Sequence, residues 1–384
     1  MTGSRYVLGP VYLIPQLQVT NAGYVSNIFG TSPVQKSDYT ATVGLGTQWL
    51  VRFGPKVYLR GTALPSYIWY ARTPEARKLG WTANNALLLL FNRLTVQLTG
   101  NSTRASTTLN SETDRRVLQS TTAGGANFEL GLTGHILLVG GASASRYRFE
   151  NNPPLSPGVL PPPQQLDRTE EAAQGGVRYR FSNYFSLDAQ VEKTRATFVN
   201  TPSFGDSETT GYLLGIGLDG PILTVHLSGG YREGTPYQGS GFPPYKTGTG
   251  SFAVGWKARP SLGFQVYGHR ETQYSLFAPY YFENMGGASV SVGLGDRVSL
   301  RGFGELGTNQ YPDAPEFPER RRDRVTTYGG GVSFEIIRRV SFALTGQETS
   351  YRSNISGFSR NILLISGGFT LQLSSGIAVK AGTP

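Results

Sequence analysis

Two of the three histidines stand near residues with which they could do chemistry: His226 precedes Ser228, and His269 precedes Glu271. On a β-strand, residues two apart point the same way and lie roughly 7 Å apart. A histidine that activates a hydroxyl must approach it to about 3.2 Å. The chain has no cysteine, no glycine-rich phosphate loop and no clustered metal ligands. We therefore expect no enzyme activity, no catalytic residues, no metal site and no cofactor.

The densest charge is the run from Glu319 to Arg324, which follows three prolines and is predicted to lie in a loop. Its basic residues are Arg320, Arg321, Arg322 and Arg324. Such a cluster can bind phosphate groups or an acidic glycan, although a solvated loop edge would look the same. The net charge of +10 also favours anionic partners. The basic residues are scattered through the sequence, so we expect no nucleic-acid binding.

Other charged and amide side chains alternate with apolar ones, as in the segments 185–192 and 223–228. A period of two with one apolar face indicates strands whose polar side meets water. The residues expected on this polar, lumen-lining face are Arg52, Arg60, Gln97, Glu129, Arg178, Arg180, Asp188, Gln190, Glu192, Lys257, Gln265, Arg301, Glu305 and Glu335. Two interpretations remain open: these charges select permeating solutes, or they form salt bridges that stiffen the wall.

The elements that must position these residues follow a repeat of about 40 residues, in which long alternating segments flank short turns. The turns are predicted at 53–56, 91–93, 132–135, 181–184, 219–221, 258–261, 295–297 and 337–339. Every second connection is longer and richer in Pro, Asn, Ser and charge. Short turns alternating with long loops are typical of an all-β, up-and-down antiparallel barrel of the transmembrane type. We predict about 18 strands, with short periplasmic turns and long outer loops.

Composition supports the barrel. The mean hydropathy of −0.24 fits a wall that is apolar outside and polar inside, and no apolar run approaches the roughly 18 residues of a membrane-spanning helix. Aromatic residues recur beside the turns, as an interfacial girdle requires. A soluble β-propeller has a similar repeat, but its blades need four short strands. Pro65, inside a predicted strand, suggests a bulge or a strand end.

The predicted organisation is an N-terminal leader of the mature chain at 1–10, a single barrel domain at 11–374 and a C-terminal tail at 375–384. The predicted location is the bacterial outer membrane. A protein of that membrane needs a secretory signal, and none is visible at Met1. We expect the secretory signal to have been removed from the mature chain.

The N-terminal region resembles the outer-membrane β-barrel porins associated with exopolysaccharide and capsule export. The resemblance rests on the segment 12–19, on Asn27-Ile28-Phe29 and on the polar loop to Asp38. In that family an Asn-Ile-Phe, loop, Asp, strand sequence opens the barrel. Ser26 stands where an acidic residue often precedes the Asn. The resemblance implies a passive conduit for a secreted polysaccharide.

Three functions follow as expectations: the polysaccharide conduit, a general diffusion porin for small and preferentially anionic solutes, and a structural or adhesive barrel with a plugged lumen. A diffusion porin predicts a loop that folds into the barrel and narrows it. Expected partners are outer-membrane lipid and lipopolysaccharide, with polysaccharide and periplasmic export components under the first interpretation. The sequence does not specify an oligomeric state.

Overall fold

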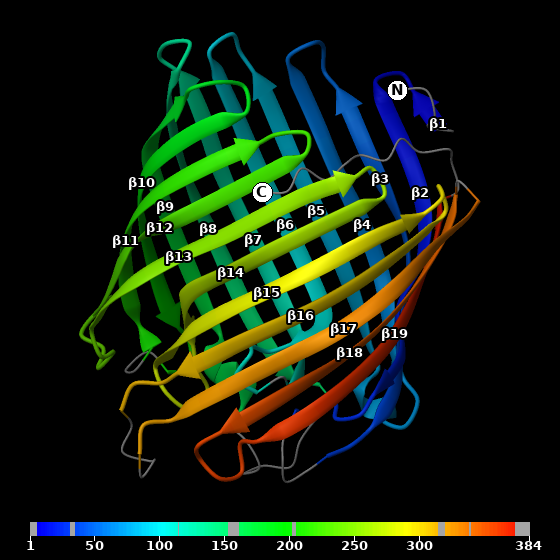
Figure 1. The fold of residues 1–384 in the computed structure, drawn as a ribbon, viewed down its shortest axis with the longest axis vertical. Helices are drawn as coiled ribbons and strands as arrows, with labels where there is room; N and C mark the ends of the chain where they lie inside the picture. Colours follow the sequence, from blue (N-terminus) through cyan, green and yellow to red (C-terminus); the bar gives the residue numbers. More distant parts are fainter. Residues whose placement is uncertain are drawn as a thin grey trace.

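The chain forms a closed antiparallel β-barrel (Figure 1). The structure is a computed structural model that describes residues 6–30, 35–113, 115–152, 161–201, 205–313, 319–337 and 339–372. Each strand from β2 onward pairs with the next along the chain, and β19 pairs with β2 to close a ring of 18 strands. Closure leaves no free edge in the ring, so every strand finds its backbone partners inside the sheet. The predicted fold class is confirmed.

The strands that make the ring are 13 to 16 residues long. They are β2 (Val11–Val25), β3 (Asp38–Arg52), β4 (Val57–Tyr70), β5 (Lys78–Leu90), β6 (Leu94–Thr108), β7 (Arg116–Gly131), β8 (Ile136–Asn151), β9 (Arg168–Arg180), β10 (Phe185–Phe198), β11 (Ser207–Asp219), β12 (Leu223–Pro236), β13 (Tyr245–Arg259), β14 (Leu262–Tyr274), β15 (Tyr280–Leu294), β16 (Val298–Gln310), β17 (Arg322–Ile337), β18 (Val340–Ser353) and β19 (Arg360–Gln372). Two short 3-10 helices, η1 (Pro74–Ala76) and η2 (Pro163–Leu166), lie in the loops. These lengths exceed the 9–11 residues that a tilted strand needs to cross a bilayer.

The connections alternate in length as predicted. Short turns follow the odd-numbered strands from β3 to β17, at the eight predicted places, and longer loops follow the even-numbered strands. Figure 1 shows the two kinds of connection at opposite ends of the barrel, with the short turns toward the top. In outer-membrane barrels the short turns face the periplasm, so the longer loops face outward from the cell.

The ends of the barrel differ in detail from the expected boundaries. A short strand, β1 (Tyr6–Leu8), lies within the segment expected to be a leader and pairs with β2. The last strand ends at Gln372. The expected tail at 375–384 lies outside the described residues.

The outward face of the barrel is apolar. On β12, for example, Leu223, Leu227 and Tyr231 are 39–41% exposed although they are hydrophobic. Their neighbours Thr224, His226 and Ser228 point to the other face, because side chains alternate along a strand. Exposure of so many apolar side chains is stable only against lipid.

Exposed aromatic residues form two rings on this outward face. Near the short turns lie Phe53, Phe91, Phe181, Trp256, Phe334 and Phe342. Toward the loops lie Tyr39, Tyr67, Trp69, Trp81, Tyr212, Tyr231 and Tyr328. Two rings that flank an apolar band mark the two lipid–water interfaces of a transmembrane barrel. Among the described residues, no helix has both the length and the apolar character needed to cross a membrane.

Candidate functional site

The lumen wall carries a network of ion pairs on β7, β9 and β10. Arg178 contacts Glu129 at 2.7 Å and Asp188 at 2.5 Å, and Arg180 reaches the second oxygen of Glu129 at 3.3 Å. Register explains the network, because Asp188 is the cross-strand partner of Arg178, and such neighbours share one face of a sheet.

A second group of cations on the same face has no carboxylate partner. Arg52, Arg60, Lys257 and Arg301 lie in the half of the barrel nearer the short turns, and in the described part of the chain none has an acidic oxygen within 4.0 Å. Arg52 instead lies over the ring of Tyr58 at 5.5 Å. These side chains give the wall an excess of positive charge at this end.

By strand register, all fourteen residues expected in the lumen lie on the face opposite the exposed apolar residues. Glu192 pairs with Arg232, and Glu305 accepts a hydrogen bond from the Tyr267 hydroxyl at 2.5 Å. A cavity of about 950 Å³ on this face is lined by Arg178, Arg180, Asp188, Gln190 and Gln265, among others. That these residues line a path for solutes stays a prediction.

The sequence did not predict which loop folds into the barrel. The connection between β6 and β7 does so: Leu109 donates its N–H to the Arg115 carbonyl at 2.8 Å, which closes a tight loop. The Asn110 side-chain oxygen accepts from the N–H groups of Glu112 and Thr113, both at 3.2 Å. This Asx-type turn needs no partner elsewhere in the chain, so it sets the loop shape locally.

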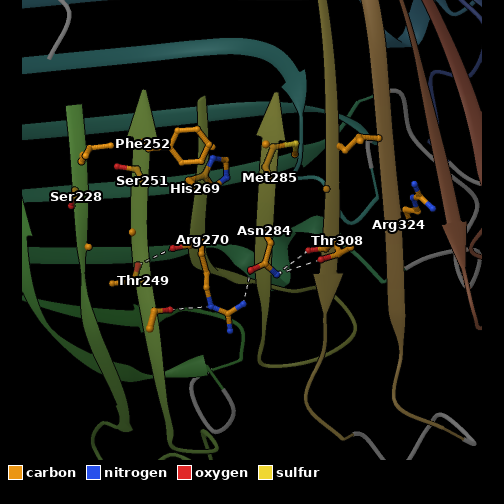
Figure 2. Close-up of a pocket in the computed structure, with 18 of the residues that line it drawn as sticks. Ser228, Thr249, Ser251, Phe252, His269, Arg270, Asn284, Met285, Thr308 and Arg324 are labelled. Atoms are coloured by element: carbon orange, nitrogen blue, oxygen red, sulfur yellow. Dashed lines mark hydrogen bonds between the residues drawn. The ribbon is translucent and has the colours of Figure 1, made fainter. Parts of the chain in front are cut away.

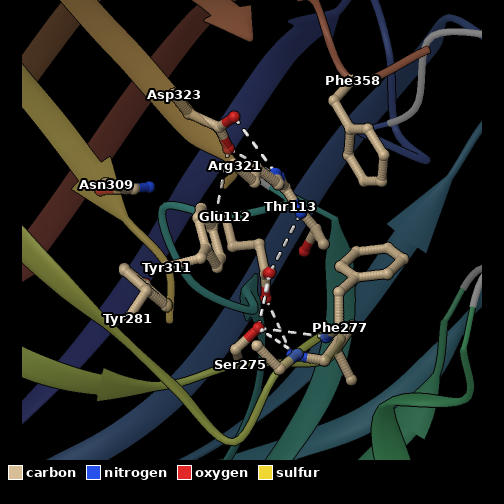
Figure 3. Close-up of polar contacts among 12 residues, drawn as sticks. Glu112, Thr113, Ser275, Phe277, Tyr281, Asn309, Tyr311, Arg321, Asp323 and Phe358 are labelled. Carbon is tan, nitrogen blue, oxygen red and sulfur yellow. Dashed lines mark hydrogen bonds and ion pairs between the residues drawn. The ribbon is translucent and has the colours of Figure 1, made fainter. Parts of the chain in front are cut away.

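The tip of this inward loop reaches the opposite wall. Glu112 accepts hydrogen bonds from the Ser275 hydroxyl at 2.6 Å and from the Leu276 N–H at 2.8 Å (Figure 3). Its backbone carbonyl accepts a hydrogen bond from Arg360 at 2.9 Å. Ser111 lies within hydrogen-bond distance of the Tyr281 hydroxyl at 3.0 Å. In a ring of 18 strands, β7 and β16 are opposite one another. A loop from β6–β7 that contacts β15 and β19 must therefore cross the lumen.

Buried charges hold the loop in this position. The side chains of Glu112 and Arg321 are both 0% exposed and lie 3.4 Å apart, and Asp323 binds the other side of the guanidinium at 2.6 Å. Burial raises the pKa of Glu112, even though Arg321 and the hydrogen bonds from Ser275 and Leu276 act to lower it. Tyr311 donates to Asp323 at 3.2 Å, and burial raises the pKa of its hydroxyl well above the usual range.

Arg321 is enclosed by aromatic rings. Its guanidinium carbon lies 3.9 Å from the ring centre of Phe358, 4.3 Å from that of Tyr311 and 5.3 Å from that of Phe277. Cation–π contact of this kind is strongest where water is excluded. The placement corrects the expected outer-loop cluster: Arg321 points into the barrel mouth, whereas Arg320, Arg322 and Arg324 are exposed. Alternation along the start of β17 separates them, a signal that was present in the sequence.

Neighbouring loops pack around the same mouth. Ile28 and Phe29 are buried against Val325, Tyr351 and Ile362, so the Asn-Ile-Phe segment is part of the mouth packing. The Ile28 carbonyl accepts from the N–H of Arg116, beside the inward loop.

Arg115, at the base of the inward loop, is buried as well. It donates to Asn151 at 2.5 Å and to the Pro161 carbonyl at 3.2 Å, and burial lowers its pKa to about 10. Around Glu112 the mouth is thus filled by protein.

Neither histidine pair forms a catalytic arrangement. His226 lies 3.2 Å from Asp219, so its ring nitrogen is directed toward a carboxylate and not toward Ser228. His269 lies 3.6 Å from both Glu271 and Glu283. The ligand atoms of His269, Glu271 and Glu283 lie within 4.8 Å of one another, close enough to hold a metal ion. The expectation of no clustered metal ligands was therefore wrong for these three residues, because Glu283 lies on the neighbouring strand and is distant in sequence.

Comparison with known proteins agrees with this architecture. Residues 6–373 match the family described as "Putative beta-barrel porin 2". No curated protein sequence matches the chain.

Several solved structures share the fold. Pseudomonas aeruginosa OccK2 (OpdF) in complex with glucuronate has a TM-score of 0.56 at 10% identity, over 94% of this chain and 98% of that one. P. aeruginosa OpdK with vanillate gives the same four values. A BenF-like porin from Pseudomonas fluorescens Pf-5 has a TM-score of 0.54 at 12% identity, over 96% and 100%. At these identities the likeness shows the fold alone.

The family match covers nearly the whole barrel, and the closed ring, the apolar band and the two aromatic rings are those of an outer-membrane protein. The chain belongs to the β-barrel porin family described as "Putative beta-barrel porin 2" and is an outer-membrane porin.

Proposed function

We propose that this porin is a passive channel for small hydrophilic solutes and that it prefers anions. The observation that carries the proposal is the inward loop, which bridges the lumen from Ser111 and Glu112 to Tyr281 and Arg360. A constriction of this kind restricts passage to small molecules. It does not suit a polymer chain, which needs a wide and continuous lumen.

Charge supports the preference for anions. Arg52, Arg60, Lys257 and Arg301 leave the short-turn half of the lumen with cations that no carboxylate neutralises in the described residues. An excess of one sign of charge along a cleft concentrates counter-ions and raises their rate of association. Two solved porins of similar fold hold glucuronate and vanillate, both carboxylated small molecules. Small carboxylates are therefore the solute class that we propose.

The test is conductance of the purified protein in a planar bilayer under a salt gradient. We expect a small single-channel conductance, a reversal potential that shows anion preference, and block or permeation by millimolar glucuronate. A large conductance that is blocked by a long acidic oligosaccharide and not by glucuronate would support the polysaccharide conduit instead. No conductance under any condition would support a plugged structural barrel.

A further inference from the structure

A hollow of about 1440 Å³ lies on the outward face of the barrel, over β11 to β18 and close to the loop end (Figure 2). Its lining includes no acidic residue among those that the structure describes. The cations that line it are Arg270, Arg320, Arg322, Arg324 and Arg352. The hollow thus concentrates positive charge on a surface that faces the outer leaflet.

Two of these arginines oppose each other directly. Arg324 on β17 and Arg352 on β18 are cross-strand partners, and both side chains are exposed on the outward face. Like charges in this position destabilise a sheet. In the described part of the chain, neither has a carboxylate within 4.0 Å. An anion bound between them would remove this repulsion.

Arg270 and Asn284 form an ordered polar edge of the hollow. The guanidinium of Arg270 donates to Asn284 at 2.5 Å, to Thr247 at 3.0 Å and to the Gly248 carbonyl at 3.0 Å. Asn284 in turn donates to Thr308 at 3.4 Å. These bonds fix the guanidinium without neutralising it, which lowers the entropy cost of binding an anion.

The floor of the hollow is apolar. Leu214 and Leu306 are 69% and 56% exposed, and Phe252 lies beside them. Gly229 and Gly286 also line it, and a Cβ on Gly229 would meet no atom within 4 Å. Backbone packing therefore does not require glycine at 229. The absence of a side chain at this position leaves the floor of the hollow open, and the floor continues into the lipid-facing apolar band.

We propose that this hollow binds the lipid A portion of lipopolysaccharide, with its phosphates on the arginines and acyl chains on the apolar floor. Arg324 lies four positions beyond Tyr328 of the aromatic ring, toward the loops, and so stands at headgroup height. The cations extend from β14 to β18, about 19 Å at roughly 4.8 Å between neighbouring strands. A disaccharide with two phosphates fits this span better than a phospholipid with one.

The proposal can be tested by native mass spectrometry of the full chain in detergent, with bisphosphorylated lipid A as the probe. The variant Arg324→Ala with Arg352→Ala is expected to bind lipid A about thirtyfold more weakly, because each substitution removes one arginine that attracts the anionic headgroup. The matched control is Arg104→Ala with Arg146→Ala. It removes the same charge from the outward face of β6 and β8, on the opposite wall, and is expected to bind as the wild type.

Binding measurements with other lipids, and one further variant, distinguish lipid A from other phosphate-bearing ligands. Dephosphorylated lipid A and phosphatidylglycerol should bind the wild type at least about tenfold more weakly than bisphosphorylated lipid A, because they engage fewer arginines. Gly229→Val, which fills the floor, should weaken lipid A binding and leave the heat-modifiable gel migration of the folded barrel intact. Equal loss in the Arg104/Arg146 control, or equal affinity for the dephosphorylated lipid, would overturn the proposal.

Discussion

Glu112 is a carboxyl group that has no contact with water and that holds the inward loop across the lumen. Burial raises its pKa above the ordinary value of 4.5, so the folded loop binds a proton more tightly than the released loop does. The stabilisation from this group is fully present below pH 4.5 and is lost as the pH rises through the raised pKa.

The inward loop should therefore be held more firmly in acid. We expect single-channel conductance to rise with pH over the range that begins near 4.5 and ends above the raised pKa of Glu112. Glu112→Gln keeps the hydrogen-bonding side chain and cannot ionise, so its conductance should not change over that range. If the glutamine variant keeps the wild-type pH profile, another group controls the loop.

Arg321 is the counter-charge for two buried carboxylates, Glu112 and Asp323. Arg321→Met retains much of the volume and removes the charge, which should lower the free energy of unfolding by about 3–5 kcal/mol. Urea unfolding of the barrel in detergent measures this loss.

The matched control is Arg322→Met, one position along β17. Arg322 is exposed on the outward face, and surface changes away from such contacts usually fall within about 0.5 kcal/mol. Equal effects of the two substitutions would show that the buried network does not stabilise the barrel mouth.

At the scale of the element, the loop between β6 and β7 combines a locally determined turn with distant contacts. Asn110 shapes the turn through its neighbours Glu112 and Thr113. The contacts to Ser275 and Arg360 join residues far apart in the sequence. These contacts depend on the arrangement of strands around the ring and not on the local sequence.

Removing the loop tip should open the channel. Replacement of residues 110–114 by Asn-Gly, a turn that suits a two-residue hairpin, leaves β6 and β7 joined and removes every contact of Glu112. We expect conductance to increase about twofold or more, because the bridge across the lumen is gone. A matched control shortens the loop 237–244, whose Phe242 packs beside Tyr245 and Tyr280 on nearby strands. Unchanged conductance in the first variant would contradict the assignment of the inward loop as the constriction.

At the scale of the whole molecule, the charge of the lumen is uneven. Carboxylates neutralise Arg178 and Arg180 on one wall, while Lys257 and Arg301 on β13 and β16 have no such partner in the described residues. An anion in the short-turn half of the lumen therefore meets a positive wall. Ion selectivity of the channel should depend on these two residues more than on the paired ones.

The variant Lys257→Glu with Arg301→Glu should lower the anion-to-cation permeability ratio and move the reversal potential toward that of a cation-preferring channel. The control Arg322→Glu with Arg324→Glu changes the net charge equally but places it on the outward face. The reversal potential of each variant in a salt gradient measures its ion selectivity. An equal shift in the two variants would mean that net charge, and not the lumen wall, sets selectivity.

The strands and their order could be predicted from the sequence, because turn chemistry, strand length and a period of two are local properties. Pro65 shows the limit of that reasoning. It lies inside β4 opposite Trp81 of β5, without the predicted bulge or strand end, and the ladder to β3 resumes in the same register on both sides of it. Because proline has no N–H to donate, the β3–β4 pairing is interrupted beside it, between Gly44–Ser66 and Thr47–Ala63, without a shift of register.

The contacts that form the constriction could not be predicted from the sequence. Glu112, Arg321 and Arg360 are separated by long stretches of sequence, and no local pattern pairs them. Alternation could have separated inward Arg321 from outward Arg322 and Arg324, but which carboxylate meets Arg321 depends on which loop enters the lumen. The barrel wall is fixed by interactions between neighbours in the chain, whereas the mouth is fixed by contacts across a closed ring.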